Sequence, residues 1–166
     1  MKTISKAQIS DLEEILEIYK RARQFMRENG NPNQWKDCHP PKQSILENIS
    51  VQNLYVIKND ETIDGVFLFD KGPDPTYEYI EGKWLNDRPY CVIHRIASSG
   101  RVKGILKDCV DYCLKYSDNI KVDTHSDNIV MQHSLEKLGF IHCGTIYVPD
   151  YGPMRAYQYD RHLDKA

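Results

Sequence analysis

The segment H-R-I-A-S-S-G-R-V-K-G-I-L, residues 94–106, gives the clearest indication of the fold. Its β-branched and apolar residues as far as Ala97 are typical of a strand, and Ser98, Ser99 and Gly100 form a turn. Apolar residues then recur with helical spacing from about residue 102 to residue 116. The segment therefore predicts a strand that turns directly into an amphipathic helix.

Such a turn can hold a phosphate group. The N–H groups of the first helical turn have no partners within the helix, and the helix dipole favours negative charge at that end. Gly104 allows a ligand to approach the backbone closely, and Arg101 and Lys103 add positive charge. An ordinary glycine-containing turn between a strand and a helix has the same appearance, so the neighbouring segments decide between the two interpretations.

The residues after this segment continue the alternation of strands and helices. A short strand is expected at 120–124, a helix from about Asp127 to the stop signal at Gly139, and strands at 140–148 and 155–159. The alternation implies parallel neighbours joined by crossovers. We therefore expect this half of the chain to hold a cofactor.

The residues before the segment predict helices followed by antiparallel strands. Ser10 and Glu13 have the spacing of a capping box, and helical periodicity continues to about Glu28. The other expected elements are a short helix at 44–49, a hairpin of strands 54–57 and 63–69, a loop with extended pieces at 71–89, and a strand at 90–97.

Composition excludes several classes of protein. The 166 residues suit a single domain spanning 1–166, and 22 basic and 24 acidic side chains give no indication of a nucleic-acid partner. No stretch has the length and apolar character of a signal peptide or a membrane span, so we expect a cytoplasmic protein without membrane contact. Five cysteines without a regular framework indicate reduced thiols, and the spacing of Cys109 and Cys113 does not match a zinc site, so no metal is expected.

Two segments resemble motifs of the GNAT superfamily of N-acetyltransferases. Residues 101–106, R-V-K-G-I-L, are similar to its Q/R-x-x-G-x-G/A pyrophosphate loop, with Leu106 in place of the second small residue. Residues 127–140, D-N-I-V-M-Q-H-S-L-E-K-L-G-F, are similar to its N-x-x-A-x-x-L-Y-E-K-L-G-F helix. Leu135 stands where the family often has a tyrosine that protonates the departing thiolate.

The resemblance extends over essentially the whole chain and implies an α/β (α+β) fold. Its sheet would be mixed and mostly antiparallel, flanked by helices, and splayed at its centre to admit the pantetheine arm of acetyl-CoA. The strand edge at the splay would contact pantetheine through its main chain. The residues expected to bind the cofactor are Ile96, Ala97, Ser98, Arg101, Val102, Lys103, Gly104, Ile105, Leu106 and Asn128.

Acyl transfer to an amine needs a base for the ammonium proton, and histidine titrates near neutrality. We prefer His94, on the central strand, to His125, which follows the next strand, although either could be a structural histidine. Asp123 shares a strand face with His125 and could orient it or meet a cationic amine. For the missing acid, Tyr147 is one alternative, and bulk water or the absence of a dedicated acid is an equal one.

The sequence thus predicts an acetyl-CoA-dependent N-acetyltransferase that acts on a primary amine of a small molecule or peptide. Trp35, Tyr55, Tyr77 and Tyr79 could shape the acceptor pocket or simply pack in the core. An acyltransferase for another chain length and a non-catalytic, acyl-CoA-binding regulatory domain remain alternatives, and the chain could form a homodimer. A dinucleotide-binding domain is disfavoured because the glycine turn comes late in the chain.

Overall fold

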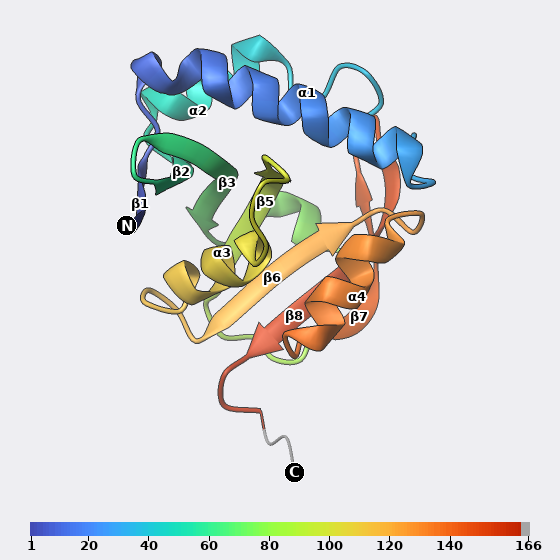
Figure 1. The fold of residues 1–166 in the computed structure, drawn as a ribbon. Coiled ribbons are helices and arrows are strands. Elements are labelled where there is room, and N and C mark those ends of the chain that lie inside the picture. The colour runs from blue at the N-terminus through green and yellow to red at the C-terminus, as the bar shows by residue number, and fades with distance from the viewer. Residues whose placement is uncertain (164–166) are drawn as a thin grey trace.

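A computed structural model describes residues 1–163 as an eight-stranded sheet with helices on both faces (Figure 1). The strand order is β1-β2-β3-β5-β6-β8-β7-β4, and of these pairs only β5 and β6 are parallel. The helices are α1 (Leu12–Glu28), α2 (Lys42–Ser50), α3 (Ile105–Cys113) and α4 (Ile129–Lys137). The strands are β1 (Lys2–Lys6), β2 (Leu54–Asn59), β3 (Thr62–Lys71), β4 (Glu81–Gly82), β5 (Cys91–Ser98), β6 (Asn119–Thr124), β7 (Ile141–Val148) and β8 (Gly152–Asp160).

Each face of the sheet has its own core. On one face α3 and α4 bury residues such as Cys109 and Leu135 against β2, β3, β5 and β6. On the other face α1 and α2 bury Tyr19 and Ile45 against β2, β3 and the end of β5. A third cluster lies where the segment before β5, including Tyr77, packs against β5, β7 and β8. The mixed, mostly antiparallel α/β fold expected from the sequence is confirmed.

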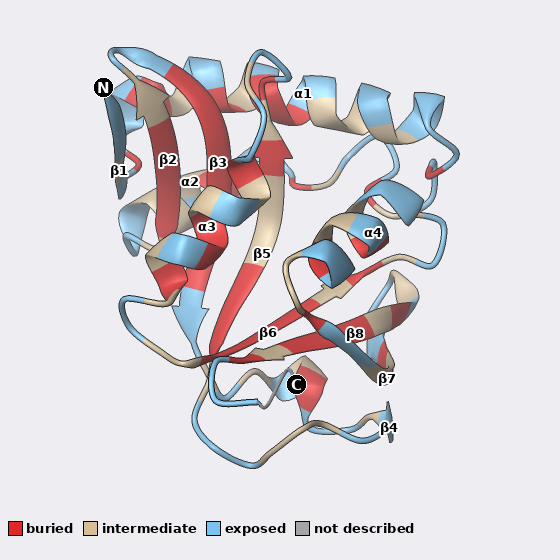
Figure 2. Ribbon diagram, turned by 60° about the horizontal axis from the view of Figure 1, so that its bottom comes forward, coloured by how far each residue is buried: buried red, intermediate tan, exposed pale blue. Residues whose placement is uncertain are grey.

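The sheet opens between β5 and β6. The two strands pair only at Cys91 with Ile120 and at Val92 with Lys121, and then they separate (Figure 2). Beyond these pairs the edge of β5 that faces β6 has no strand beside it. The sheet is therefore splayed at its centre, as the resemblance implied.

A β-bulge interrupts β5 at the start of this opening. Val66 of β3 pairs with Ala97 and Leu68 pairs with His94, so that one residue of β3 faces two residues of β5. Arg95 within the bulge has a φ of 55°, in the left-handed region that costs a non-glycine residue about 1–2 kcal/mol. The buried hydroxyl of Tyr19 donates to the Arg95 carbonyl at 2.8 Å and supports this conformation. Bulges redirect side chains, and this one lies beside the opening.

Three sequence expectations need correction. The polar N-terminal residues form an edge strand, β1, which was not expected. The reciprocal cap at the first helix involves Gln8 and Asp11, whose carboxylate accepts the Gln8 N–H at 2.9 Å, instead of Ser10 and Glu13. Helix α3 begins at Ile105 instead of about residue 102, because Gly104 before it is left-handed with a φ of 86°.

Among residues 1–163, no helix combines the length and the apolar character that crossing a membrane requires.

Candidate active site

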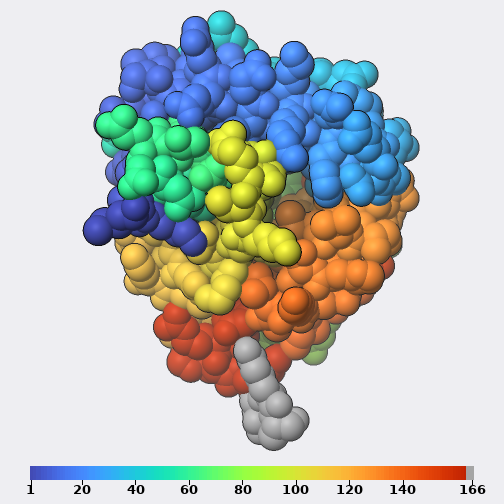
Figure 3. Space-filling view, in the orientation of Figure 1, coloured from blue at the N-terminus to red at the C-terminus, as the bar shows by residue number. Residues whose placement is uncertain are grey.

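A cavity of about 380 Å³ lies in the opening of the sheet. Ile93 and Ile96 line it from β5, Val122 lines it from β6, and Met131 lines it from α4. Figure 3 shows the surface hollowed between the turn before α3 and the segment that carries α4. The cavity continues under the end of α1, where Trp35 and Tyr151 form part of its wall.

His94 projects into this cavity between two carboxylates. Its Nε2 lies 2.9 Å from Oδ2 of Asp74, and its Nδ1 lies 3.6 Å from Oδ1 of Asp123. The first distance is that of a hydrogen bond, and the second is too long for one. The imidazole is thus held from one side, while its other nitrogen faces a carboxylate across a small gap.

The two carboxylates set the ionisation of this histidine. Burial alone lowers the pKa of His94, but the hydrogen bond to Asp74 and the charge of Asp123 outweigh burial and raise the pKa above its ordinary value of 6.5. The hydrogen bond to His94 lowers the pKa of Asp74 to about 2. Asp74 therefore stays ionised at neutral pH and favours the protonated imidazole.

The segment between β3 and β5 positions both carboxylates. Asp74 accepts hydrogen bonds from the N–H and the hydroxyl of Thr76, and its own N–H donates to the Tyr90 hydroxyl at 2.8 Å. The buried Tyr77 donates its hydroxyl to Asp123 at 2.6 Å. The geometry around His94 therefore depends on how this segment is fixed to the sheet.

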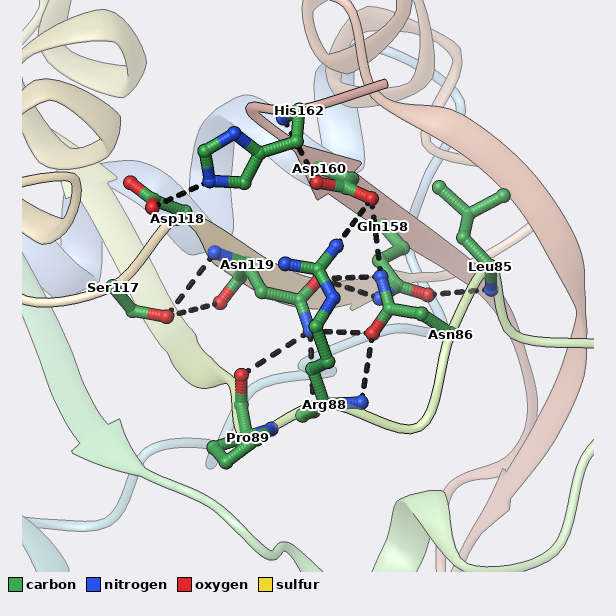
Figure 4. Close-up of polar contacts among 10 residues, drawn as sticks. All are labelled: Leu85, Asn86, Arg88, Pro89, Ser117, Asp118, Asn119, Gln158, Asp160 and His162. Atoms are coloured by element: carbon green, nitrogen blue, oxygen red, sulfur yellow. Dashed lines mark hydrogen bonds and ion pairs between the residues drawn. The ribbon is translucent and has the colours of Figure 1, made fainter.

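A polar network fixes the end of that segment (Figure 4). The buried amide of Asn119 donates to Oδ1 of Asn86 and to the carbonyls of Arg88 and Pro89, and its own oxygen accepts from Gln158 at 2.6 Å. Arg88 pairs with Asp160 of β8 at 2.6 Å. These contacts attach residues 85–89 to β6 and β8.

We expect Asn119→Ala to lower the free energy of unfolding by about 3 kcal/mol, because it leaves several buried polar groups without partners. For a chain of this length the melting temperature should fall by about 6–12 °C. Thermal unfolding followed by circular dichroism measures the change. Ser134→Ala, which removes an exposed hydrogen bond within α4, is the control and should change little. A shift for Asn119→Ala no larger than that of the control would contradict this role for the network.

The turn before α3 leaves its backbone open to a ligand. A Cβ added at Gly104 would meet no atom within 4 Å, and the first hydrogen bond within the helix is made by the N–H of Asp108. Lys103 is exposed beside this turn. The N–H groups at the start of α3 therefore face open space, as an anion site requires.

The Arg101 side chain stabilises the turn by binding to the protein itself. Its Nε donates to the buried Asp64 at 3.0 Å, and the hydroxyl of Ser99 donates to the same carboxylate at 2.8 Å. Burial alone raises the pKa of Asp64, but these hydrogen bonds and one from Asn59 lower it below the ordinary value. A second cation, Arg21 of α1, lies directly over Gly100, which the sequence analysis did not foresee.

The other expected cofactor-binding residues lie along the opening with their side chains turned mainly into the protein. Ala97 and Ile105 are buried, while Ile96, Val102 and Leu106 pack against the core beneath α3 and α4. Ser98 accepts the N–H of Gly100 at 3.0 Å.

Asn128 lines the cavity with its polar atoms already engaged. Its Oδ1 accepts the N–H of Met131 and caps α4, and its Nδ2 donates to Oε1 of Gln34 at 3.0 Å. The same Gln34 oxygen accepts hydrogen bonds from Asn31 and Thr124. Gln34, which was not singled out from the sequence, thus joins the segment after α1 to β6 and α4.

The second candidate base, His125, does not line the cavity. Strand β6 ends at Thr124, so the alternation that would have placed His125 beside Asp123 stops before it. Its Nδ1 accepts the N–H of Asp127 at 3.1 Å in the turn before α4. The structure therefore brings Asp123 to His94 instead of to His125.

Several aromatic candidates are placed by the structure in different environments. Trp35 lines the cavity, whereas Tyr55 packs in the core beneath α3. Tyr79 and Tyr147 are exposed, and their rings lie against each other in a tilted contact outside the cavity lining. Leu135 is fully buried, so the position of the usual tyrosine carries no acid.

His39 and Tyr151 complete the aromatic wall, and no local pattern in the sequence had identified them. The Tyr151 hydroxyl lies 3.1 Å from Nδ1 of His39, and the His39 ring makes edge contacts with Trp35 on one side and Tyr151 on the other. Burial lowers the pKa of His39 to about 4, and the charge of Arg95 contributes to this shift. His39 is therefore neutral at physiological pH.

Comparison with solved structures shows that acetyltransferases share this fold. No protein-family model matches the chain, and no curated protein matches it. An acetyltransferase of the GNAT family from Streptococcus agalactiae superimposes with a TM-score of 0.87 and 28% identity, over 98% of this chain and 96% of that one. Two more distant structures share the fold. Salmonella typhimurium yncA, solved with its cofactor acetyl-CoA, has a TM-score of 0.62 at 15% identity and covers 99% of this chain and 96% of its own. A ribosomal-protein-alanine N-acetyltransferase from Brucella melitensis has a TM-score of 0.64 at 15% identity and covers 95% of this chain and 99% of its own.

These likenesses extend over nearly the whole chain, and the two motif segments lie at the opening of the shared sheet. On this evidence the chain has the fold of the GNAT acetyltransferases, and it is similar over nearly its whole length to a member of that family.

Proposed function

We propose that this protein transfers an acetyl group from acetyl-CoA to an amine. The observation that carries the proposal is the position of His94, which lies between Asp74 and Asp123 at the acceptor end of a cavity that begins in the opened sheet. Acetyl-CoA would supply the acetyl group as an activated thioester. The chain must then bind this cosubstrate, hold the amine, and remove its proton.

The residues present fit acetyl-CoA. The open space above Gly104 and the free N–H groups at the start of α3 suit a pyrophosphate, and exposed Lys103 adds charge. The unpaired edge of β5 next to the opening suits the amide groups of pantetheine. The binding of acetyl-CoA and of CoA by proteins of the same fold supports this assignment.

His94 is the base in this proposal. A neutral imidazole that donates its Nε2–H to Asp74 leaves the lone pair of Nδ1 directed toward the gap in front of Asp123. An ammonium group bound at Asp123 would lie within reach of that nitrogen, directly or through one water molecule. Asp74 fixes the tautomer and orientation of the ring, and Asp123 attracts the cationic amine.

The transfer itself needs few further groups. His94 takes one proton from the bound ammonium group, and the neutral amine nitrogen then forms a bond to the acetyl carbon. The C–S bond breaks with its electron pair on sulfur, and the nitrogen loses a second proton as the amide forms. The bulge leaves residues 95 and 96 outside the regular pairing with β3, so an N–H there can donate to the thioester oxygen as negative charge develops. With Leu135 buried and Tyr147 outside the cavity lining, water carries the second proton from the nitrogen to the thiolate.

Calorimetry and an amine screen test the proposal. We expect one CoA to bind per chain, and we expect acetyl-CoA with the right amine to give an acetylated product of the expected mass together with free CoA. Cys38 is exposed and would react with a thiol reagent, so Cys38→Ser lowers the protein's background in the thiol measurement.

Absence of binding at millimolar CoA to correctly folded protein would overturn the assignment. Binding without turnover of any amine would instead favour the alternative of a regulatory, acyl-CoA-binding domain.

A further inference from the structure

The cavity contains a second charged site besides His94. Arg95 lines the cavity, and its guanidinium hydrogen-bonds to the side chain of Asn48 on α2. Among residues 1–163 it takes part in no ion pair, whereas Arg88, Arg101 and Arg161 each pair with an aspartate. A half-buried guanidinium that pairs with no carboxylate of the protein can form an ion pair with an anionic ligand.

The bulge accounts for this placement. In a regular strand, His94 and Arg95 would point to opposite faces of the sheet. Here His94 contacts Asp74 and Asp123, and Arg95 contacts α2. Helix α2 covers the face of the sheet on which His94 also lies. The left-handed conformation of Arg95, supported by Tyr19, therefore brings two consecutive side chains into one cavity. Glycine or asparagine would adopt this conformation at lower cost, but neither would bring a cation to the cavity.

Charge is separated along the cavity as a result. Asp74 and Asp123 lie at His94, and Arg95 lies toward Asn48 and His39. His39 is neutral and hydrogen-bonded to Tyr151, and part of the lowering of its pKa comes from Arg95, whose charge is not neutralised there. The acceptor region thus has a negative pole for an ammonium group and a positive pole for an anion.

We propose that the acceptor is a small amine that also carries a carboxylate, such as a free amino acid, with its carboxylate bound by Arg95 and its amine at His94. The planar guanidinium can hold a carboxylate through two parallel hydrogen bonds. The inference rests on the proposed function in that an amine is acetylated. The further inference is that the protein recognises its acceptor through the acceptor's own carboxylate. An amide or a simple alkylamine has no such group.

The experiment compares each of the twenty amino acids with its primary amide, using acetyl-CoA and mass detection of the product. The wild-type protein should show a kcat/KM about 10- to 100-fold higher for at least one acid than for the matching amide. Arg95→Gln should remove this preference, and Arg95→Lys should restore part of it. Arg27→Gln, at an exposed arginine of α1 that pairs with Asp37, is the control and should keep the preference.

A second measurement does not depend on turnover. Calorimetry of the same pairs with the CoA-saturated protein should show tighter binding of the acid, and Arg95→Gln should abolish the difference. Acetylation of amides and acids at equal rates by the wild-type protein would overturn the inference and leave the proposed function intact. Preferential binding of acids without turnover would support the carboxylate site and contradict the proposed function, and equal binding of both forms would contradict the carboxylate site.

Discussion

His94→Ala is expected to lower kcat about 10²- to 10⁴-fold, which is the usual contribution of a positioned acid or base. The affinity for CoA should stay near that of the wild type, because His94 lies at the acceptor end of the cavity and the expected phosphate site lies at the start of α3. Steady-state kinetics with the best amine, together with calorimetry of CoA, measure both quantities.

The pH profile gives the mechanism a second test. His94 must be neutral to accept a proton, and its pKa lies above 6.5 because of Asp74 and Asp123. Activity should therefore rise with pH through that raised pKa and be lost below it. Asp74→Asn removes one of the charges that favour the imidazolium, so it should move this limb of the profile to lower pH, whereas ionisation of the free amine alone would leave the limb unchanged.

His125→Ala is the matched comparison. His125 lies in a turn, where its Nδ1 accepts the N–H of Asp127. Removal of its side chain should therefore leave kcat within a few-fold of the wild type. Retention of wild-type turnover by His94→Ala with loss of turnover in His125→Ala would move the base to the second site. Full activity of both variants would mean that substrate ionisation and ordered water suffice.

The main elements of the fold could be predicted because their signals are local. The strand, turn and helix across residues 94–113 each show in the spacing of apolar residues and in Gly100 and Gly104. The edge strand β1 was missed because its exposed residues carry little apolar alternation. The start of α3 was placed too early because Val102 packs against the core from within the turn, which imitates a helical position.

The site could be predicted only in part, because its contacts join distant parts of the chain. His94 could be selected by its place on the central strand, but Asp74 reaches it from a loop 20 residues earlier. The position of Arg95 in the cavity could not be found from alternation, since the rule that successive strand residues face opposite sides fails at a bulge. Likewise, Gln34 and Tyr151 reach the cavity only through tertiary packing.

Gly104→Val is expected to weaken CoA binding by about 10²-fold or more. The added side chain would fill the space above the start of α3, where a pyrophosphate would otherwise accept hydrogen bonds from the backbone, each worth about 1.5–3 kcal/mol. Stability should fall less, because a non-glycine residue at a φ of 86° costs about 1–3 kcal/mol and the new Cβ meets no other atom within 4 Å. Calorimetry of CoA and thermal unfolding of the same preparation separate the two effects.

Gly30→Val is the matched control for backbone strain. Gly30 follows α1, has a φ of 80°, and also has no atom within 4 Å of an added Cβ. The two valines should therefore lower the melting temperature by similar amounts, while only the one at Gly104 blocks the ligand. Equal CoA affinity in the two folded variants would show that the phosphate group binds elsewhere. A large loss of affinity confined to Gly104→Val would assign the pyrophosphate to the start of α3, because the control separates blocked access from general strain.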